Sequence, residues 1–360
     1  MIKFLICTNN LKSLHPSFRL NGQKFNAISI KALALFFIKN GTDNEACLGD
    51  FIKKWIDDSE NILINTSGTI SVPKLLPFSK SSIVNSAKST GTYFDLKPGD
   101  SALCCLPFSF IAGKMMFIRA WVLGLKLDII EPSSTPLITI SSKRYDFSAM
   151  VPLQLQNSIS HISNIKILLV GGAPLSKSLA SKIYGQKSCV YETFGMTETL
   201  THIAVKNISS GESSFSILPN ISISQDSRGC LIVSAPDLSV HNLHTNDIIN
   251  KISDYKFLWL GRYDNVINSG GIKIQPEILE KYIEGQIKSR FFITSIPDNK
   301  INEKVILIVE GKTQKFDLKW NSINPLMRPK EIYFTKKFFE NKSGKIQRKK
   351  TLYSLNLYNS

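Results

Sequence analysis

Residues 61–80, NILINTSGTISVPKLLPFSK, join a short apolar run to a loop rich in hydroxyl side chains. The run Ile62–Ile64 predicts a buried strand, and the loop after it contains Thr66, Ser67, Gly68, Thr69 and Lys74. Small residues around a glycine leave backbone N–H groups accessible, and a lysine adds positive charge, which suits a polyphosphate. The spacing is not that of a Walker A loop. These residues alone slightly favour an ordinary Ser/Thr turn.

Outward from this loop, apolar strands alternate with helices. Strands are expected in SALCCLP, LKLDII, IKILLVGGAPL and SCVYETFG, and helices near 28–38, 45–57, 110–124 and 176–184. This alternation predicts a parallel α/β sheet, with ligands at the carboxyl ends of its strands. The hydroxyl loop, Gly171–Gly172 and Phe194–Gly195 all fall at such ends.

Between about 205 and 260 the pattern changes to short alternating strands, which predict an antiparallel, barrel-like part. A small α+β segment follows FLWLGRYD, with a helix from Pro276 and strands in RFFITSI and KVILIVEG. We therefore expect an α/β protein with two domains, residues 1–262 and 263–360, because the pattern changes near Gly261–Asn265.

Composition excludes several classes of protein. Lys and Arg number 44 against 28 Asp and Glu, for a net charge of +16 over 360 residues. The basic residues are scattered, and only Lys342–Lys350 approaches a cluster, so we expect no nucleic-acid partner. The six cysteines show no C-x-x-C pair, and no apolar run approaches the ~18 residues of a membrane span. The apolar start is too short for a signal peptide, and we expect a cytoplasmic protein.

Six stretches together resemble the adenylate-forming superfamily of acyl-CoA synthetases, luciferases and nonribosomal adenylation domains. In chain order they are TSGTISVPK, GGAPL, FGMTE, TNDI, GRYDNVINSGGIKIQPEILE and SGKIQR. Each is a weak signal alone, but six in the family's order, from about 62 to 350, are specific. The resemblance implies a mobile C-terminal domain and a reaction in two steps. A small carboxylic acid is joined to AMP from ATP with loss of pyrophosphate, and the thiol of coenzyme A then displaces AMP.

The resemblance also implies roles for residues of the large domain. Thr66–Thr69 and Lys74 would hold the β- and γ-phosphates. Phe194 and Gly195 would face adenine across from Gly171, Gly172 and Ala173, although Phe194 could be a core residue and the glycine pair a turn. Thr197 would bind the α-phosphate and Glu198 a Mg²⁺ ion, which prefers carboxylate and phosphate oxygens. Alternatively, these two residues merely begin a helix.

Further roles follow from the later motifs. Asp247 would accept hydrogen bonds from the ribose hydroxyls, unless it is an ordinary loop acid, and Arg262 would contact ribose or phosphate, unless it is a surface arginine. Lys345 would be catalytic, although it lies in a basic tail. On the resemblance alone, Asp264 would be the hinge, and Gly270–Gly271 a close-packed strand beside the pantetheine tunnel.

The phosphate loop departs from the family pattern. Ile70 stands where a hydroxyl is usual, and Ser71 and Leu75 stand where glycines are usual. Fewer donors predict weaker ATP binding or, alternatively, a decayed enzyme. Because Glu198, Asp247, Arg262 and Lys345 are all present, we expect an active one. Only about 60 residues precede the loop, fewer than is usual in the family.

The segments CLPFSFIAGKMMFIRAWVLGLKLDIIEPSSTPL and YDFSAMVPLQ resemble the short o-succinylbenzoate–CoA ligases of menaquinone synthesis. Phe110 stands where many relatives have a histidine. Arg119 lies on an apolar helix, where a guanidinium is costly unless an anion meets it, such as the unreactive carboxylate of this substrate. Alternatively, Arg119 extends to solvent or is paired internally. Another aryl- or acyl-CoA ligase, or a catalytically silent adenylate-binding protein, also fits.

We predict that Lys345→Ala abolishes acyl-adenylate formation but leaves the thiol step largely intact when the acyl-adenylate is supplied. One positive charge would stabilise the charge that builds up in the first transition state. Pyrophosphate release measures the first step and thioester yield the second. Equal losses in both steps would contradict a role confined to adenylation.

Overall fold

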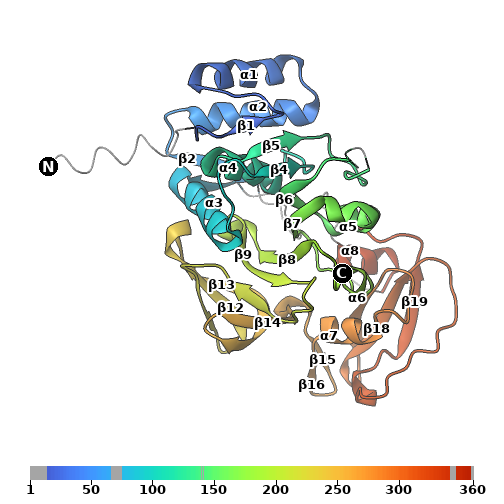
Figure 1. The fold of residues 1–360 in the computed structure, drawn as a ribbon. Helices are drawn as coiled ribbons and strands as arrows, with labels where there is room; N and C mark the ends of the chain where they lie inside the picture. Colours follow the sequence, from blue (N-terminus) through green and yellow to red (C-terminus); the bar gives the residue numbers. More distant parts are fainter. Residues whose placement is uncertain (1–13, 66–74, 139, 141, 341–345, 358–360) are drawn as a thin grey trace.

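The computed structural model describes residues 14–65, 75–138, 140, 142–340 and 346–357. Two helices, α1 (Ala27–Asn40) and α2 (Asp43–Ile56), pack side by side at one end of the molecule (Figure 1). Both were expected from the sequence. The hydroxyl of Thr42 caps α2 by accepting from the Glu45 N–H, and the Glu45 carboxylate in turn accepts from the Thr42 N–H. This capping box fixes where α2 begins.

The parallel half of the large sheet follows the predicted alternation. Its strand order is β1 (Arg19–Leu20), β5 (Lys126–Ile129), β4 (Ser101–Cys104), β6 (Tyr145–Met150), β7 (Ile165–Val170) and β8 (Cys189–Gly195). The connecting helices are α3 (Lys80–Phe94), α4 (Ile111–Leu123), α5 (Pro152–Asn157), η1 (Ile159–Asn164) and α6 (Lys177–Ile183). Buried apolar residues on both faces of β4 and β7 confirm a sheet covered on its two sides.

The strand that opens the phosphate-loop stretch lies elsewhere than expected. β2 (Asn61–Asn65) pairs antiparallel with β3 (Leu75–Ser79) in a separate two-stranded sheet. Ile62 and Ile64 are buried while Leu63 between them is 58% exposed. The apolar run is therefore a strand with one buried face, which composition alone does not distinguish from a central parallel strand. The prediction that this loop follows a strand of the parallel sheet is wrong, because β2 pairs antiparallel with β3. Residues 66–74 themselves lie outside the described residues.

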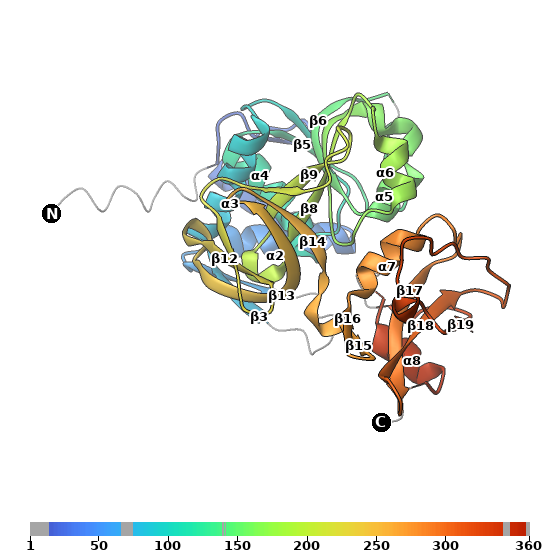
Figure 2. The ribbon, with the colours of Figure 1, turned by 90° about the horizontal axis from the view of Figure 1, so that it is seen from below.

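The antiparallel half continues the same sheet. Beyond β8 the order is β9 (His202–Asn207), β10 (Phe215–Ile217), β14 (Lys256–Arg262), β13 (Val240–Ser253), β12 (Cys230–Ala235) and β11 (Ser222–Gln225). The expected barrel-like part is thus joined to the parallel strands through the β8–β9 pair, and it curves away from them (Figure 2). Phe215 and Phe257 stack at its core with ring centroids 5.5 Å apart.

A second sheet begins after β14 ends at Arg262. It contains β15 (Ile267–Ser269), β16 (Ile272–Ile274), β17 (Phe291–Asp298), β18 (Asn302–Glu310) and β19 (Glu331–Thr335), with helices α7 (Pro276–Ile283) and α8 (Arg348–Ser354). This part lies beside the large one (Figure 2). A domain boundary at 262/263 stays a prediction that this change of sheet supports. The remaining 3₁₀ turns include η3 (Pro236–Leu238) and η5 (Pro325–Met327).

No helix among the described ranges is long and apolar enough to cross a membrane.

Candidate active site

Two neighbouring strands bring the expected adenine-side residues together. Gly171–Ala173 follow the end of β7, and Phe194 and Gly195 end β8, which pairs with β7 in parallel. Phe194 is half-buried, and its ring centroid lies 5.6 Å from that of Phe215 and 5.3 Å from that of Phe257. Phe194 therefore rests on the core of the antiparallel half without being enclosed by it, as a stacking surface for a flat ligand must.

Close packing inside the protein explains two of the glycines. A Cβ on Gly171 would lie 2.3 Å from Thr193 Oγ1, and one on Gly195 would lie 2.4 Å from the Thr201 carbonyl oxygen. Neither position has room for a side chain. Gly172 has φ +89°, a backbone conformation that glycine adopts without strain. The fold itself therefore favours glycine at these three positions, in addition to any requirement from a ligand.

The motif after Phe194 forms a short turn at the surface. Thr197 and Glu198 belong to the 3₁₀ turn η2 (Thr197–Thr199), so they do begin a helical element. Glu198 is exposed. The described part of the chain holds no group of three or more His, Cys, Asp or Glu residues arranged to bind a metal. A single carboxylate still fits Mg²⁺, which often binds one or two carboxylates and takes its other ligands from phosphates and water.

Asp247 sits in a built carboxylate site rather than in an open loop. It lies on β13, is 7% exposed, and pairs across the ladder with Arg262 on β14. The Arg262 Nη1 lies 3.3 Å from Asp247 Oδ2, and the indole Nε1 of Trp259 donates to Asp247 Oδ1 at 2.9 Å. The sequence analysis missed Trp259, because residues three apart on a regular strand point to opposite faces, and only the register shift in the β13–β14 ladder brings both Trp259 and Arg262 to Asp247.

Arg262 also contacts the expected hinge. Its Nη2 lies 2.8 Å from Oδ2 of Asp264, which is in the 3₁₀ turn η4 (Tyr263–Asn265). Asn246 Nδ2 donates to the other oxygen of Asp264 at 2.8 Å. Partial burial lowers the pKa of Arg262, but the carboxylates of Asp247 and Asp264 outweigh it and raise the pKa overall. One guanidinium thus bridges the candidate ribose acceptor and the candidate hinge.

The other expected positions divide into three groups. Gly270 and Gly271, with φ +56° and +79°, form the tight turn between β15 and β16, and a Cβ on Gly271 would meet open space. The expectation of a close-packed strand there is therefore wrong, since the turn geometry alone requires glycine. Lys345, Lys74 and Thr66–Thr69 lie outside the described residues. Leu75, a departure from the family pattern, begins β3 and is 58% exposed.

Arg119 is buried, as its apolar neighbours on α4 predicted. It is 3% exposed, and burial lowers the pKa of its guanidinium to about 10. Among the described residues no carboxylate forms an ion pair with it. Lys114, on the same helix, instead lies 5.7 Å above the Phe51 ring. Phe110 lies at the N-terminal end of α4. It is about 13 Å from Arg119 along the helix axis, because an α-helix rises ~1.5 Å per residue.

Neutral side chains hold the Arg119 guanidinium. Its Nε donates to Thr90 Oγ1 at 3.3 Å and its Nη2 to Thr201 Oγ1 at 3.1 Å, with His202 Nδ1 at 3.5 Å. Burial, and then the charge of Arg119, lower the pKa of His202 well below its usual value. His202 is therefore neutral, and the cluster carries one positive charge. The sequence analysis missed these three partners, which come from α3 and from the segment after FGMTE.

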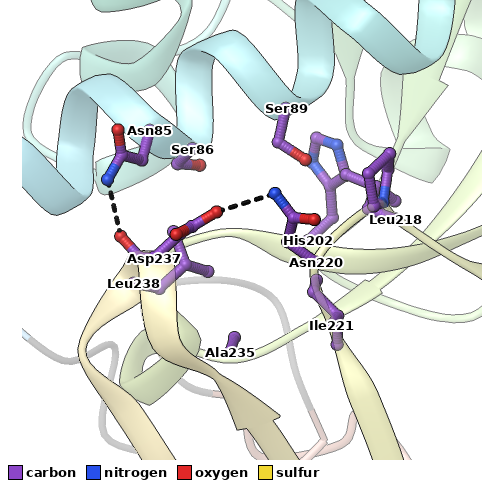
Figure 3. A pocket seen from close by; sticks show the side chains of 11 residues that line it. Asn85, Ser86, Ser89, His202, Leu218, Asn220, Ile221, Ala235, Asp237 and Leu238 are labelled. Carbon is purple, nitrogen blue, oxygen red and sulfur yellow. Dashed lines mark hydrogen bonds between the residues drawn. The ribbon is translucent and has the colours of Figure 1, made fainter.

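A small cavity lies on the other side of His202, between α3 and the loops that follow β10 and β12 (Figure 3). Its volume is about 20 Å³, enough for one water molecule and not for a substrate. Asn85 and Asn220, which line it, both donate hydrogen bonds to Asp237. Arg119 is not among the residues that line this cavity.

Comparison with known proteins agrees with this geometry. Residues 40–223, more than half of the chain, match the family model described as AMP-binding enzyme. A solved structure of an acyl-CoA synthetase (AMP-forming)/AMP-acid ligase II-like protein from Dyadobacter fermentans is 32% identical, with TM-score 0.60. The match covers 90% of this chain and 98% of that one. The chain belongs to the AMP-binding enzyme family, which confirms its resemblance to adenylate-forming enzymes and its fold class.

Relatives with more specific names, two curated sequences and one solved structure, are similar to this chain at lower identity. The 2-succinylbenzoate–CoA ligase of Lactococcus lactis is 25% identical over 81% of this chain and 71% of its own. That of Listeria monocytogenes is 26% identical over 86% and 73%. The Bacillus subtilis o-succinylbenzoate coenzyme A synthetase, solved with ATP and magnesium, has TM-score 0.71 at 18% identity, over 83% of this chain and 74% of that one. This last likeness shows the fold.

We predict that Asp247→Asn raises the KM for ATP by about tenfold to a hundredfold, because a hydrogen bond to a charged group contributes about 1.5–3 kcal/mol. ATP titration of the acid-dependent reaction and calorimetric binding measure it. Asp254→Asn is the matched control, since Asp254 is an exposed acid of the same β13–β14 hairpin, paired with Lys251. Equal effects of the two substitutions would contradict a ribose contact.

Proposed function

We propose that this protein is an o-succinylbenzoate–CoA ligase of menaquinone biosynthesis. It would convert the acid, ATP and coenzyme A into the acyl-CoA, AMP and pyrophosphate through an acyl-adenylate. Three considerations support the proposal: membership of the AMP-binding family, the names of the curated relatives, and the surroundings of Arg119. The organisation into domains 1–262 and 263–360, with a cytoplasmic location, is part of the same proposal.

The observation that carries the choice of acid is the burial of Arg119 without a carboxylate. Taking a guanidinium out of water costs several kcal/mol unless an anion or good hydrogen bonds compensate it. The guanidinium donates to the hydroxyls of Thr90 and Thr201, which are neutral and compensate less than a carboxylate does. Thr201 follows Glu198 by three residues, so the guanidinium reaches the segment expected to bind the α-phosphate and metal. A dicarboxylate could react at one end and meet Arg119 at the other.

The proposed reaction assigns work to the other residues. In the first step an oxygen of the acid's carboxylate attacks the α-phosphorus of ATP, the bond to the bridging oxygen breaks, and pyrophosphate leaves. Thr197 would hold the α-phosphate and Lys345 the developing negative charge. Glu198 would hold Mg²⁺, which when bound supplies positive charge to the phosphates. In the second step the sulfur of coenzyme A attacks the acyl carbon, the thiol's proton is released to solvent and AMP leaves, with Gly270–Gly271 beside the thiol's arm.

Pyrophosphate release with a panel of acids tests the proposal against its alternatives. We expect o-succinylbenzoate to be activated better than benzoate or a fatty acid. Preference for one of those acids would make the protein another aryl- or acyl-CoA ligase. Binding of ATP with no pyrophosphate from any acid would instead favour a catalytically silent adenylate-binding protein.

We predict that Arg119→Ala lowers kcat/KM for o-succinylbenzoate by about thirtyfold to several thousandfold. Removing one partner of a desolvated charge pair costs about 2–5 kcal/mol, and each 1.4 kcal/mol is about a factor of ten. A monoanionic analogue, with the distal carboxylate replaced by a neutral group, should be a poor substrate that responds little to the substitution.

Lys114→Ala is the matched control for this measurement, because Lys114 is a cation of the same helix that contacts Phe51 instead. It should leave the preference between the two acids unchanged. If Arg119→Ala impairs both acids alike, Arg119 has a structural role and the assignment of its anion is wrong.

A further inference from the structure

A nearly buried ion pair lies beside the candidate adenine site, because Glu192 stands two residues before Phe194 on β8 and points to the same face of the sheet. Glu192 on β8 and Lys206 on β9 are partners in the antiparallel ladder, and Lys206 Nζ lies 2.7 Å from Glu192 Oε2. Their side chains are only 10% and 17% exposed, respectively. Neither residue belongs to the motifs that the sequence analysis singled out, and the proposed reaction does not use them.

Glu192 holds the loop on one side of the site. Its second oxygen, Oε1, accepts the backbone N–H of Leu175 at 3.2 Å. Leu175 lies two residues after Ala173, in the connection between β7 and α6. β7 and β8 are paired in parallel up to Val170 and Glu192, so this bond adds a tie just beyond the last ladder contact. The carboxylate thereby fixes how far the 171–175 loop stands from β8.

Lys206 supports the opposite side. Its ammonium lies 4.7 Å from the centre of the Phe215 ring, a cation–π contact. Phe215 in turn packs against Phe194, with 5.6 Å between ring centroids. A single ion pair therefore touches the loop on one side of the candidate adenine site through Leu175, and the aromatic residue on the other side through Phe215.

A gain in folding stability does not by itself explain a buried ion pair. Charges removed from water lose hydration that their attraction only partly restores, and an apolar pair of similar volume is often as stable or more so. Removing one partner, by contrast, leaves an unpaired charge in the interior. The pair is best explained by the geometry that it imposes on the two walls.

We propose that Glu192 and Lys206 are positioning residues for ATP, which set the separation between the 171–175 loop and Phe194. The proposal rests on the assignment of these two segments as the walls of the adenine site, and not on the identity of the acid. The carboxylate acts through its acceptor bond to Leu175, and Lys206 neutralises that carboxylate and supports Phe215.

Two double variants separate positioning from packing. Glu192→Gln with Lys206→Met and Glu192→Leu with Lys206→Met both remove the two charges, but only glutamine keeps an acceptor for the Leu175 N–H. We expect the leucine variant to bind ATP at least about tenfold more weakly than the glutamine variant, at similar Tm. Calorimetric titration with ATP and Mg²⁺ measures this without any acid, so a wrong substrate assignment would not affect it.

The steady-state constants provide the second readout. The KM for ATP should rise in the leucine variant while the KM for the acid changes little. The single Lys206→Met variant, which leaves a buried carboxylate unpaired, should have a lower Tm than either double variant. Equal ATP affinity in the two double variants, with the Tm of both near that of the wild type, would show that the pair only packs, and the proposal would be wrong.

Discussion

The candidate site is built on β8, which pairs in parallel with β7 on one edge and antiparallel with β9 on the other. This strand is where a doubly covered parallel sheet becomes a curved antiparallel one. Its parallel neighbour delivers the 171–175 loop to the carboxyl edge, and its own end delivers Phe194. The turn between β8 and β9 holds Thr197 and Glu198 at the surface and returns the chain through Thr201 to Arg119. Gly195 permits this turn because no side chain fits against the Thr201 carbonyl oxygen.

Charge is distributed unevenly around that strand. Where it pairs with β9, Glu192 and Lys206 neutralise each other, and in the antiparallel half Asp247 and Arg262 do the same. Arg119 differs, because in the described structure it meets hydroxyl groups, a thioether and a neutral imidazole, but no carboxylate. Among the described cations of the site, Arg119 alone is buried without a carboxylate partner. This imbalance supports an anionic group on the substrate remote from the reacting carboxylate.

The contacts of Arg262 suggest how nucleotide and domain position are related. Its guanidinium is shared between Asp247, on the large sheet, and Asp264, in the turn that leads to the second sheet. Ribose hydroxyls that bind Asp247 would compete with Arg262 for Oδ2, since the indole of Trp259 already donates to Oδ1. The turn at 263–265 therefore lies within direct electrostatic reach of the candidate ribose site.

The sequence by itself determined the alternation of strands and helices, the change of pattern near 205 and again near 262, and the order of the six motifs. These features depend on local periodicity and on short motifs, which a single chain displays directly. It also indicated the burial of Arg119, because the residues three and four positions away on one helix are apolar.

Only the tertiary structure decided which segments meet. Residues 61–65 pair with β3 rather than joining the parallel sheet, because a short apolar run does not specify its partner. Thr90, Thr201 and His202 converge on Arg119 from segments 29, 82 and 83 residues distant in sequence. Trp259 and Glu192 gain their contacts from ladder register, and the glycines at 171 and 195 owe their identity to neighbours across the sheet. Such contacts depend on long-range pairing, and the local pattern of one sequence carries little information about it.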